Sequence, residues 1–116
     1  MSEVINYAIH EYEGIKIIEA SGNLTRNTYK NFSAIIQRVL DKDSVMIDLS
    51  QIKIITSSGL ETIADLSWEA KQSEKRLVIL WPSEDLIHLA DTMGLIDYLT
   101  LASSYEEGLT KISYFT

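Results

Sequence analysis

Two short, mostly apolar runs flank a segment with helical periodicity, and this arrangement restricts the fold more than any other feature. The runs are Val45–Leu49, which is apolar except for Asp48, and Leu77–Trp81. Apolar, branched runs of this length are too short for a helix and are typical of strands covered on both faces. The segment between them repeats its apolar residues at helical spacing from Leu60 to Ala70. A strand, a helix and a second strand in this order predict parallel neighbours joined by a right-handed crossover.

The N-terminal part of the chain predicts a β-hairpin. Val4, Ile5, Tyr7 and Ile9 are apolar among polar neighbours, and a second β-rich run covers residues 15–20. The connecting segment, Glu11-Tyr12-Glu13-Gly14, has the composition of a turn. The sheet is therefore expected to be mixed, with the hairpin added to a parallel part.

A first helix is expected after the hairpin, running to about Lys42. Thr25, Asn27 and Thr28 compete as its N-cap. Its buried face is predicted by residues at three- and four-residue spacing: Tyr29, Phe32, Ile35, Ile36, Val39 and Leu40.

The last third of the chain continues the alternation. Pro82-Ser83 is expected to open a helix that ends at Gly94, and Leu95–Leu101 to form a last strand. Ser103 and Ser104 each precede a glutamate by three residues, which predicts a capped terminal helix through about Tyr114. No repeat or linker interrupts the pattern. We therefore predict one domain, residues 1–116, of the α/β class, with an N-terminal hairpin, a mostly parallel sheet and about four helices.

Three consecutive hydroxyl residues, Thr56-Ser57-Ser58, stand where a strand-like run gives way to a helical pattern. Ser58 and Glu61 have the spacing of a capping box, so Ser58 is predicted to cap the helix. Ser57 is then expected just outside the first turn. A phosphate on its hydroxyl would face the positive end of the helix dipole. The alternative is that both serines serve only the helix start.

Composition excludes several classes of function. The formal charge is −7 and the ten basic residues form no run, which argues against nucleic acid. The absence of cysteine removes disulfides and thiolate chemistry, and fits a cytoplasmic protein. No stretch approaches the roughly 20 apolar residues of a membrane span, so no membrane insertion is expected.

Enzyme, metal and cofactor sites are not predicted. A nucleophile elbow needs glycine two residues away on both sides of the serine, but Ser57 has Ile55 and Gly59 there. His10 and His88 are far apart in the sequence and belong to no ligand pattern. Phosphate-binding glycine motifs are missing, as is the acidic pair of a receiver domain. A binding module remains.

Several stretches together resemble the STAS family, in particular the bacterial anti-sigma factor antagonists. The resemblance rests on Val45-Met46-Ile47-Asp48-Leu49-Ser50 followed by Ile54-Ile55-Thr56-Ser57-Ser58-Gly59-Leu60. Family members usually have a strand ending in Asp-Leu, then Asp-Ser-Ser-Gly-Leu or Asp-Ser-Thr-Gly-Leu. Weaker matches follow in the expected order: the turn at Gly22, the run at 77–81, Met93-Gly94-Leu95, and the closing helix from Ser104 to Leu109.

The resemblance implies a protein-binding switch, not a catalyst. An unmodified domain of this family binds a serine-kinase anti-sigma factor, the kinase phosphorylates the first serine of the pair, and a metal-dependent phosphatase removes the phosphate. Ser57 takes the phosphorylated position; Ser58 and Thr56 are secondary candidates. The implied partner-binding residues are Asn23, Thr25, Thr56, Ser57, Ser58, Gly59, Leu60 and Glu61. A monomer or weak dimer is expected.

Two departures from the family pattern leave a second function open. Thr56 replaces the usual aspartate before the serines, and Thr25 replaces an acid near the turn at Gly22. Glu61 stands where a second glycine is common. If the missing acids orient the serine for the kinase, the domain would instead be an unphosphorylated scaffold, or a regulatory subunit of a stress-signalling or transporter complex.

Overall fold

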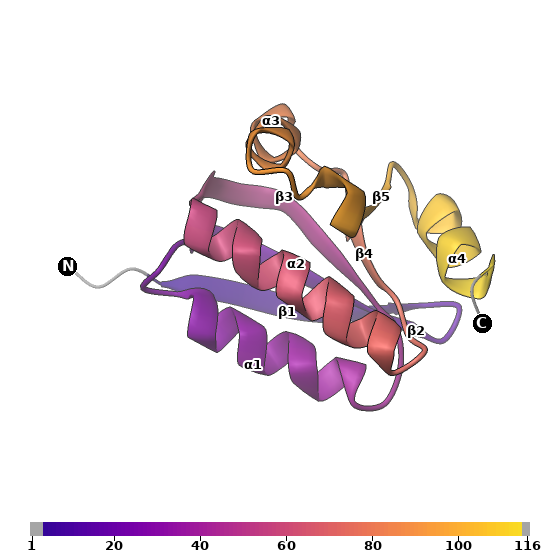
Figure 1. Ribbon diagram of the computed structural model, residues 1–116. Coiled ribbons are helices and arrows are strands. Elements are labelled where there is room, and N and C mark those ends of the chain that lie inside the picture. The colour runs from indigo at the N-terminus through magenta and orange to yellow at the C-terminus, as the bar shows by residue number, and fades with distance from the viewer. Residues whose placement is uncertain (1–3, 115–116) are drawn as a thin grey trace.

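The computed structural model describes residues 4–114, which form one mixed five-stranded sheet and four α-helices (Figure 1). The elements follow the predicted order of hairpin, then alternating helices and strands. Their bounds are β1 Ile5–Tyr12, β2 Ile15–Leu24, α1 Tyr29–Leu40, β3 Val45–Ile55, α2 Ser57–Gln72, β4 Leu77–Leu80, α3 Glu84–Thr92, the 3-10 helix η1 Ile96–Tyr98, β5 Thr100–Ala102 and α4 Tyr105–Tyr114.

The sheet has the order β1-β2-β3-β4-β5, so each strand pairs with its neighbours in sequence. β1 and β2 are antiparallel, and the other pairs are parallel. The hairpin turns at Glu13 and Gly14, whose φ angles are 50° and 84°. Two successive positive φ angles are those of a tight hairpin turn that matches the twist of its strands. The predicted fold class and hairpin are confirmed.

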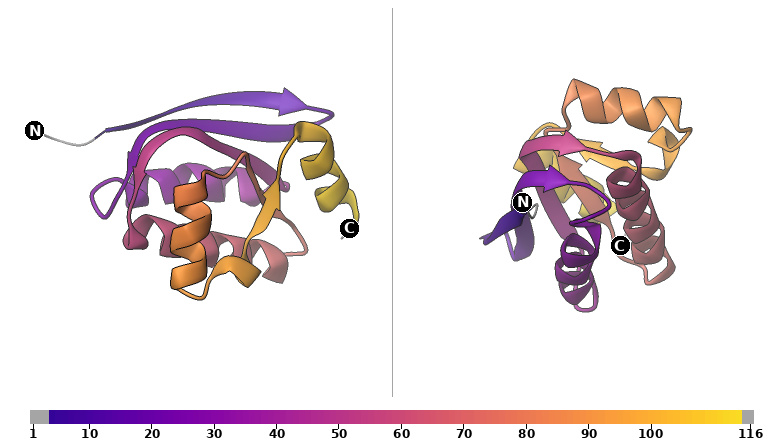
Figure 2. Two further views of the ribbon diagram at one scale, coloured as in Figure 1. Left: turned by 90° about the horizontal axis from the view of Figure 1, so that it is seen from above. Right: turned by 90° about the vertical axis from the view of Figure 1, so that its left-hand side faces the viewer.

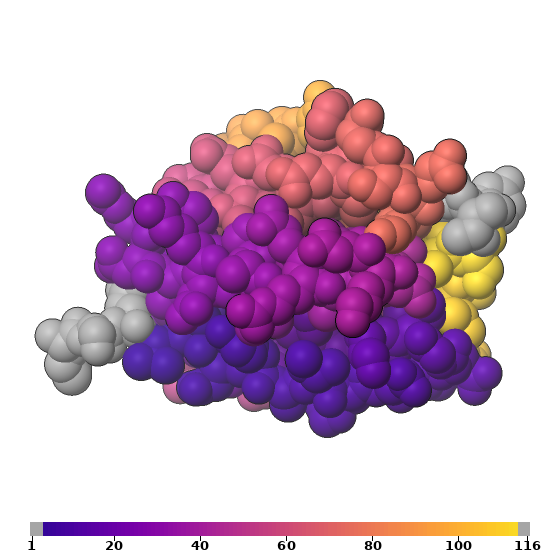
Figure 3. Space-filling model, turned by 90° about the horizontal axis from the view of Figure 1, so that it is seen from below, coloured from indigo at the N-terminus to yellow at the C-terminus, as the bar shows by residue number. Residues whose placement is uncertain are grey.

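The core has two parts, one on each face of the sheet. The larger part lies under α1 and α2, which run side by side along one face of the sheet (Figure 2), and α3 adds Leu86 and Ala90 to it. Phe32, Leu60 and Ile63 are fully buried there. The smaller part lies on the other face, where α4 covers Met46 and Leu80. α1 and α2 lie side by side, as the space-filling view shows (Figure 3).

Two predicted strands differ from the structure. β3 is longer than the apolar run Val45–Leu49 that predicted it, because it continues through Ser50-Gln51 to Ile55 with two register shifts against β2. The last strand is shorter than the predicted Leu95–Leu101. Gly94, at φ 71°, ends α3, and the Leu95 amide donates back to the Ala90 carbonyl at 2.8 Å. This turn leads into η1, so the last strand covers only Thr100–Ala102.

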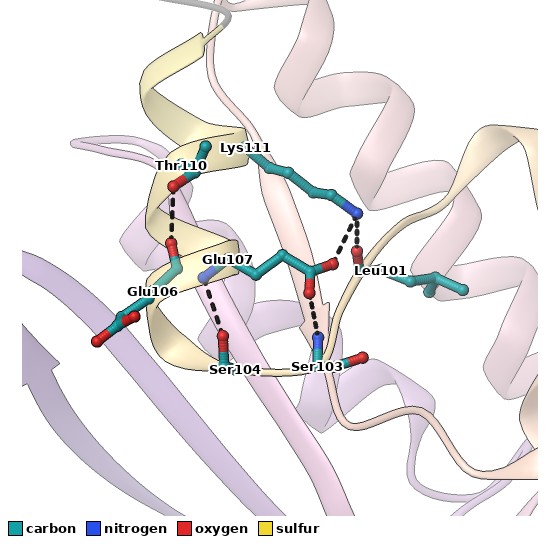
Figure 4. A network of polar contacts seen from close by, with 7 residues as sticks. All are labelled: Leu101, Ser103, Ser104, Glu106, Glu107, Thr110 and Lys111. Atoms are coloured by element: carbon teal, nitrogen blue, oxygen red, sulfur yellow. Dashed lines mark hydrogen bonds and ion pairs between the residues drawn. The ribbon is translucent and has the colours of Figure 1, made fainter.

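The start of α4 is stabilised by a network around Glu107 (Figure 4). The Glu107 amide donates to Ser104 Oγ at 3.0 Å, and the Ser103 amide donates to Glu107 Oε2 at 3.3 Å. Lys111 Nζ lies 3.1 Å from Glu107 Oε1. The structure therefore selects the second of the two predicted serine–glutamate pairs.

A Glu107→Gln variant is expected to lower the melting temperature slightly at neutral pH. The hydrogen bond from Lys111, followed by that from Ser103, lowers the pKa of Glu107. A lowered pKa in the folded state stabilises the fold above the unfolded-state pKa, and this contribution is lost as pH falls through the folded-state value. Thermal unfolding followed by circular dichroism should therefore show a wild-type advantage that shrinks in acid. An equal difference at all pH values would contradict it.

Candidate functional site

The hydroxyl triplet lies at the junction between β3 and α2, but its roles differ from those predicted. Thr56 is the N-cap: its backbone is extended and its Oγ1 accepts from the Gly59 amide at 3.4 Å. The prediction that Ser58 caps the helix is wrong, and so is the placement of Ser57 outside it. Ser57 is the first helical residue, and Ser58 the second. Threonine, like serine and aspartate, is one of the preferred helix caps.

This position of the cap is set by a distant contact. The Thr56 amide donates to the Leu24 carbonyl at 3.0 Å, which ties the start of α2 to the end of β2. Gly59 lies against the same place: a Cβ atom there would be 2.6 Å from the Leu24 oxygen. Only a residue without a side chain allows this approach, so α2 must start where it does.

Ser57 is exposed, and its hydroxyl makes no hydrogen bond to another residue within the described part of the chain. It occupies the first turn of a 16-residue helix, where backbone amides lack intrahelical partners and the dipole favours negative charge. The side chain is thus accessible to an enzyme and free of a structural task. A phosphate on it would have a favourable electrostatic position.

The other predicted partner-binding residues divide into supporting and surface positions. Gly59 and Leu60 are buried, so they position the helix start. Glu61 is exposed, and Ser58 is half-buried beside it. Thr25 is only 6% exposed, so its side chain points inward.

Thr25 instead orders the loop between β2 and α1. Its amide donates to Thr28 Oγ1 at 2.9 Å, and its own Oγ1 accepts from the Asn27 amide at 3.1 Å. Thr28 Oγ1 donates to the Asn23 carbonyl at 2.7 Å. Asn23 pairs in register with Ile54, so this loop lies close to the hydroxyl triplet. The hydroxyl groups of Thr25 and Thr28 form hydrogen bonds with backbone groups of the loop and so hold it in a compact turn.

A polar hollow of about 600 Å³ lies between the starts of α1 and α2. It brings two cations and two acids beside Ser58 and Thr62, and its full lining is Arg26, Tyr29, Lys30, Ser58, Glu61, Thr62 and Asp65. Sequence reasoning missed Arg26 and Lys30. Their four-residue spacing at a helix start was the available signal, but it does not say which second helix they would face.

Thr56→Ala is expected to lower the free energy of unfolding by about 1 kcal/mol or less, because a helix cap is lost and its hydrogen bond is long. Thr56→Asp should restore stability, since aspartate caps equally well and suits the dipole. Urea unfolding of both variants measures this. Equal losses in the two would show that Thr56 acts through something other than its cap.

Within residues 4–114 no group of three His, Cys, Asp or Glu side chains is arranged to hold a metal ion. The helices in that range are also too short or too polar to cross a bilayer.

A model of the STAS domain matches residues 6–108, which is most of the chain. The chain belongs to the STAS domain family. The resemblance to this family seen in the sequence is therefore confirmed.

Solved structures share this fold. An anti-sigma factor antagonist from Mycobacterium paratuberculosis is 20% identical, with a TM-score of 0.80 and 95% of each chain covered. The phosphorylated form of the Bacillus cell fate determinant SpoIIAA is 16% identical, with a TM-score of 0.66, covering 91% of this chain and 98% of that one. At these identities the similarity concerns the fold alone.

One similar sequence has a different described role. The intermembrane phospholipid transport system binding protein MlaB of Haemophilus influenzae is 33% identical over 60 residues. The match covers 52% of this chain and 57% of that protein. Proteins with two different described roles are thus similar to this chain.

Proposed function

We propose that this STAS domain is an anti-sigma factor antagonist that binds a serine-kinase anti-sigma factor and is released when Ser57 is phosphorylated. The observation that carries the proposal is that Thr56, and not Ser57, caps the helix. Thr56 caps α2, which leaves the exposed Ser57 hydroxyl available without loss of the helix start. The proposed binding surface is the start of α2, with Ser57, Ser58 and Glu61, and the adjacent loop from Asn23 to Thr28.

Phosphorylation at this position suits a switch because its cost falls on the complex and not on the free domain. A phosphate adds about −1.5 to −2 charge and strongly bound water. Removing that water in an interface costs several kcal/mol unless a basic group receives the phosphate. In the free domain the group stays in solvent at a helix N-terminus, where the dipole favours it. A metal-dependent serine phosphatase would return the domain to its binding form.

The experiment is incubation of the domain with its cognate anti-sigma kinase and ATP, followed by mass-spectrometric site mapping. The proposal expects one phosphate, on Ser57, and loss of the complex. Absence of phosphate on Ser57, Ser58 and Thr56, while the kinase still binds, contradicts it.

The similarity to the MlaB protein supports a second candidate. In it, the domain is a constitutive binding subunit of a membrane-associated transport complex, and the triplet only shapes the contact surface. Thr25 and Thr56 stand where the family resemblance implies acidic residues, which agrees with a site that no kinase uses. In this case Ser57→Ala should leave complex assembly intact and no phosphorylated form should be found in cells.

A further inference from the structure

β3 extends beyond the strand that pairs with it on one side. β4 pairs only with Val45 to Asp48, whereas β2 stays paired along the other edge as far as Ile55. No described strand therefore pairs with the α3-facing edge of β3 from Leu49 onward. The Ser50 amide is satisfied by Asp48 Oδ1 at 2.9 Å. The rest of this edge is a candidate for pairing with another chain.

A groove of about 410 Å³ lies along this open edge, between β3 and α3. Figures 1 and 2 show α3 beside the C-terminal half of β3. Apolar side chains from both elements line it, among them Ile52, Leu86 and Leu89. Ile54 also lines it and is 54% exposed, so it adds an accessible apolar side chain to the groove.

We infer that this groove binds an extended segment of a partner protein, which adds to β3 as a further strand. An open strand edge offers main-chain hydrogen bonds, and an apolar groove beside it offers a place for alternate side chains. The edge from Leu49 to Ile55 is roughly 20 Å long at about 3.3 Å per residue. Its two register shifts limit the regular part, so a segment of about four to six residues fits.

The chemistry of the groove favours an apolar segment with little net charge. Its rim carries one cation, Lys53, and one anion, Asp85. Neither a nucleic acid nor an anionic headgroup finds a basic cluster there. The groove ends at Ile55, two residues before Ser57, so the inference deepens the proposed function by naming how the switched partner is held.

The test uses a pool of random linear 12-residue peptides displayed on phage and selected on the whole domain. Enriched peptides are expected to alternate apolar with polar residues. A synthetic copy should lose at least about tenfold in affinity for an Ile54→Glu variant by calorimetry. Ile87→Glu, which changes an exposed isoleucine of α3 outside the groove, is the matched control and should bind normally. When the peptide's backbone nitrogens are methylated one at a time, methylation at every second residue should abolish binding, because alternate N–H groups of a strand point toward the same neighbour.

Three results would overturn the inference: no enrichment, unchanged binding by Ile54→Glu, or insensitivity to backbone methylation. If no peptide is enriched and an acyl-chain detergent binds the domain but not the Ile54→Glu variant, the groove is assigned to lipid instead. The assay uses neither kinase nor phosphate, so failure here leaves the Ser57 switch standing. Absence of phosphorylation, conversely, leaves the groove standing.

Discussion

A Ser57→Asp variant should lose binding to the cognate anti-sigma kinase by about 100-fold or more, while its melting temperature stays within a few degrees of wild type. The loss corresponds to about 3 kcal/mol, in the range expected for placing a hydrated charge in an interface. Stability should hold because Ser57 makes no hydrogen bond to another described residue and an acid suits the first turn of a helix. Surface plasmon resonance and thermal unfolding measure the two quantities.

Ser73→Asp is the matched control for this experiment. Ser73 is exposed at the C-cap of the same helix, so it receives the same charge at the opposite end. Binding should be unchanged, with a small stability loss because the dipole there disfavours an anion. If both variants bind equally weakly, net charge alone governs the interaction. If Ser57→Asp unfolds the domain, Ser57 is a structural residue and the proposed switch is wrong.

Gly59→Ala should lower the free energy of unfolding by about 2 to 3 kcal/mol or more. The new Cβ would lie 2.6 Å from the Leu24 oxygen and 2.8 Å from Leu24 Cγ. The backbone atom cannot move without disturbing the Thr56–Leu24 hydrogen bond, so overpacking is not relieved cheaply. Urea unfolding measures the change.

Gly108→Ala separates this clash from the general effect of removing a glycine. Gly108 is also helical, but its added Cβ would meet the flexible Met46 side chain at 3.0 Å. Alanine favours the helix by about 1 kcal/mol, which offsets the tight contact. The variant should therefore be nearly as stable as wild type. Equal destabilisation of both variants would show that the Leu24 contact is not special.

Local signals in the sequence predicted most of the fold. The Glu13-Gly14 turn, the Ser83 cap and the Gly94 stop each depend on chemistry within a few residues, and each is found where it was expected. The predicted alternation of strands and helices is confirmed. It could be predicted because the apolar residues of each helix recur at regular spacing.

The site was predicted only in part because its geometry depends on contacts between distant segments. The spacing of Ser58 and Glu61 predicted the cap at position 58, but contacts with Leu24, more than 30 residues earlier, place it at Thr56. β3 runs through its polar break because β2 holds it with shifted register. The inward direction of Thr25 likewise follows from its bond partners in the folded loop.

The starts of α1 and α2 are both anchored by backbone hydrogen bonds at the end of β2. The Leu24 carbonyl accepts the Thr56 amide, and the next carbonyl, that of Thr25, accepts the Tyr29 amide at 2.9 Å. Opening either helix start therefore loosens the anchor of the other, and the two form one cooperative unit of local unfolding. A partner that binds only α2 would therefore also slow the exchange of amide hydrogens at the start of α1, which it does not contact.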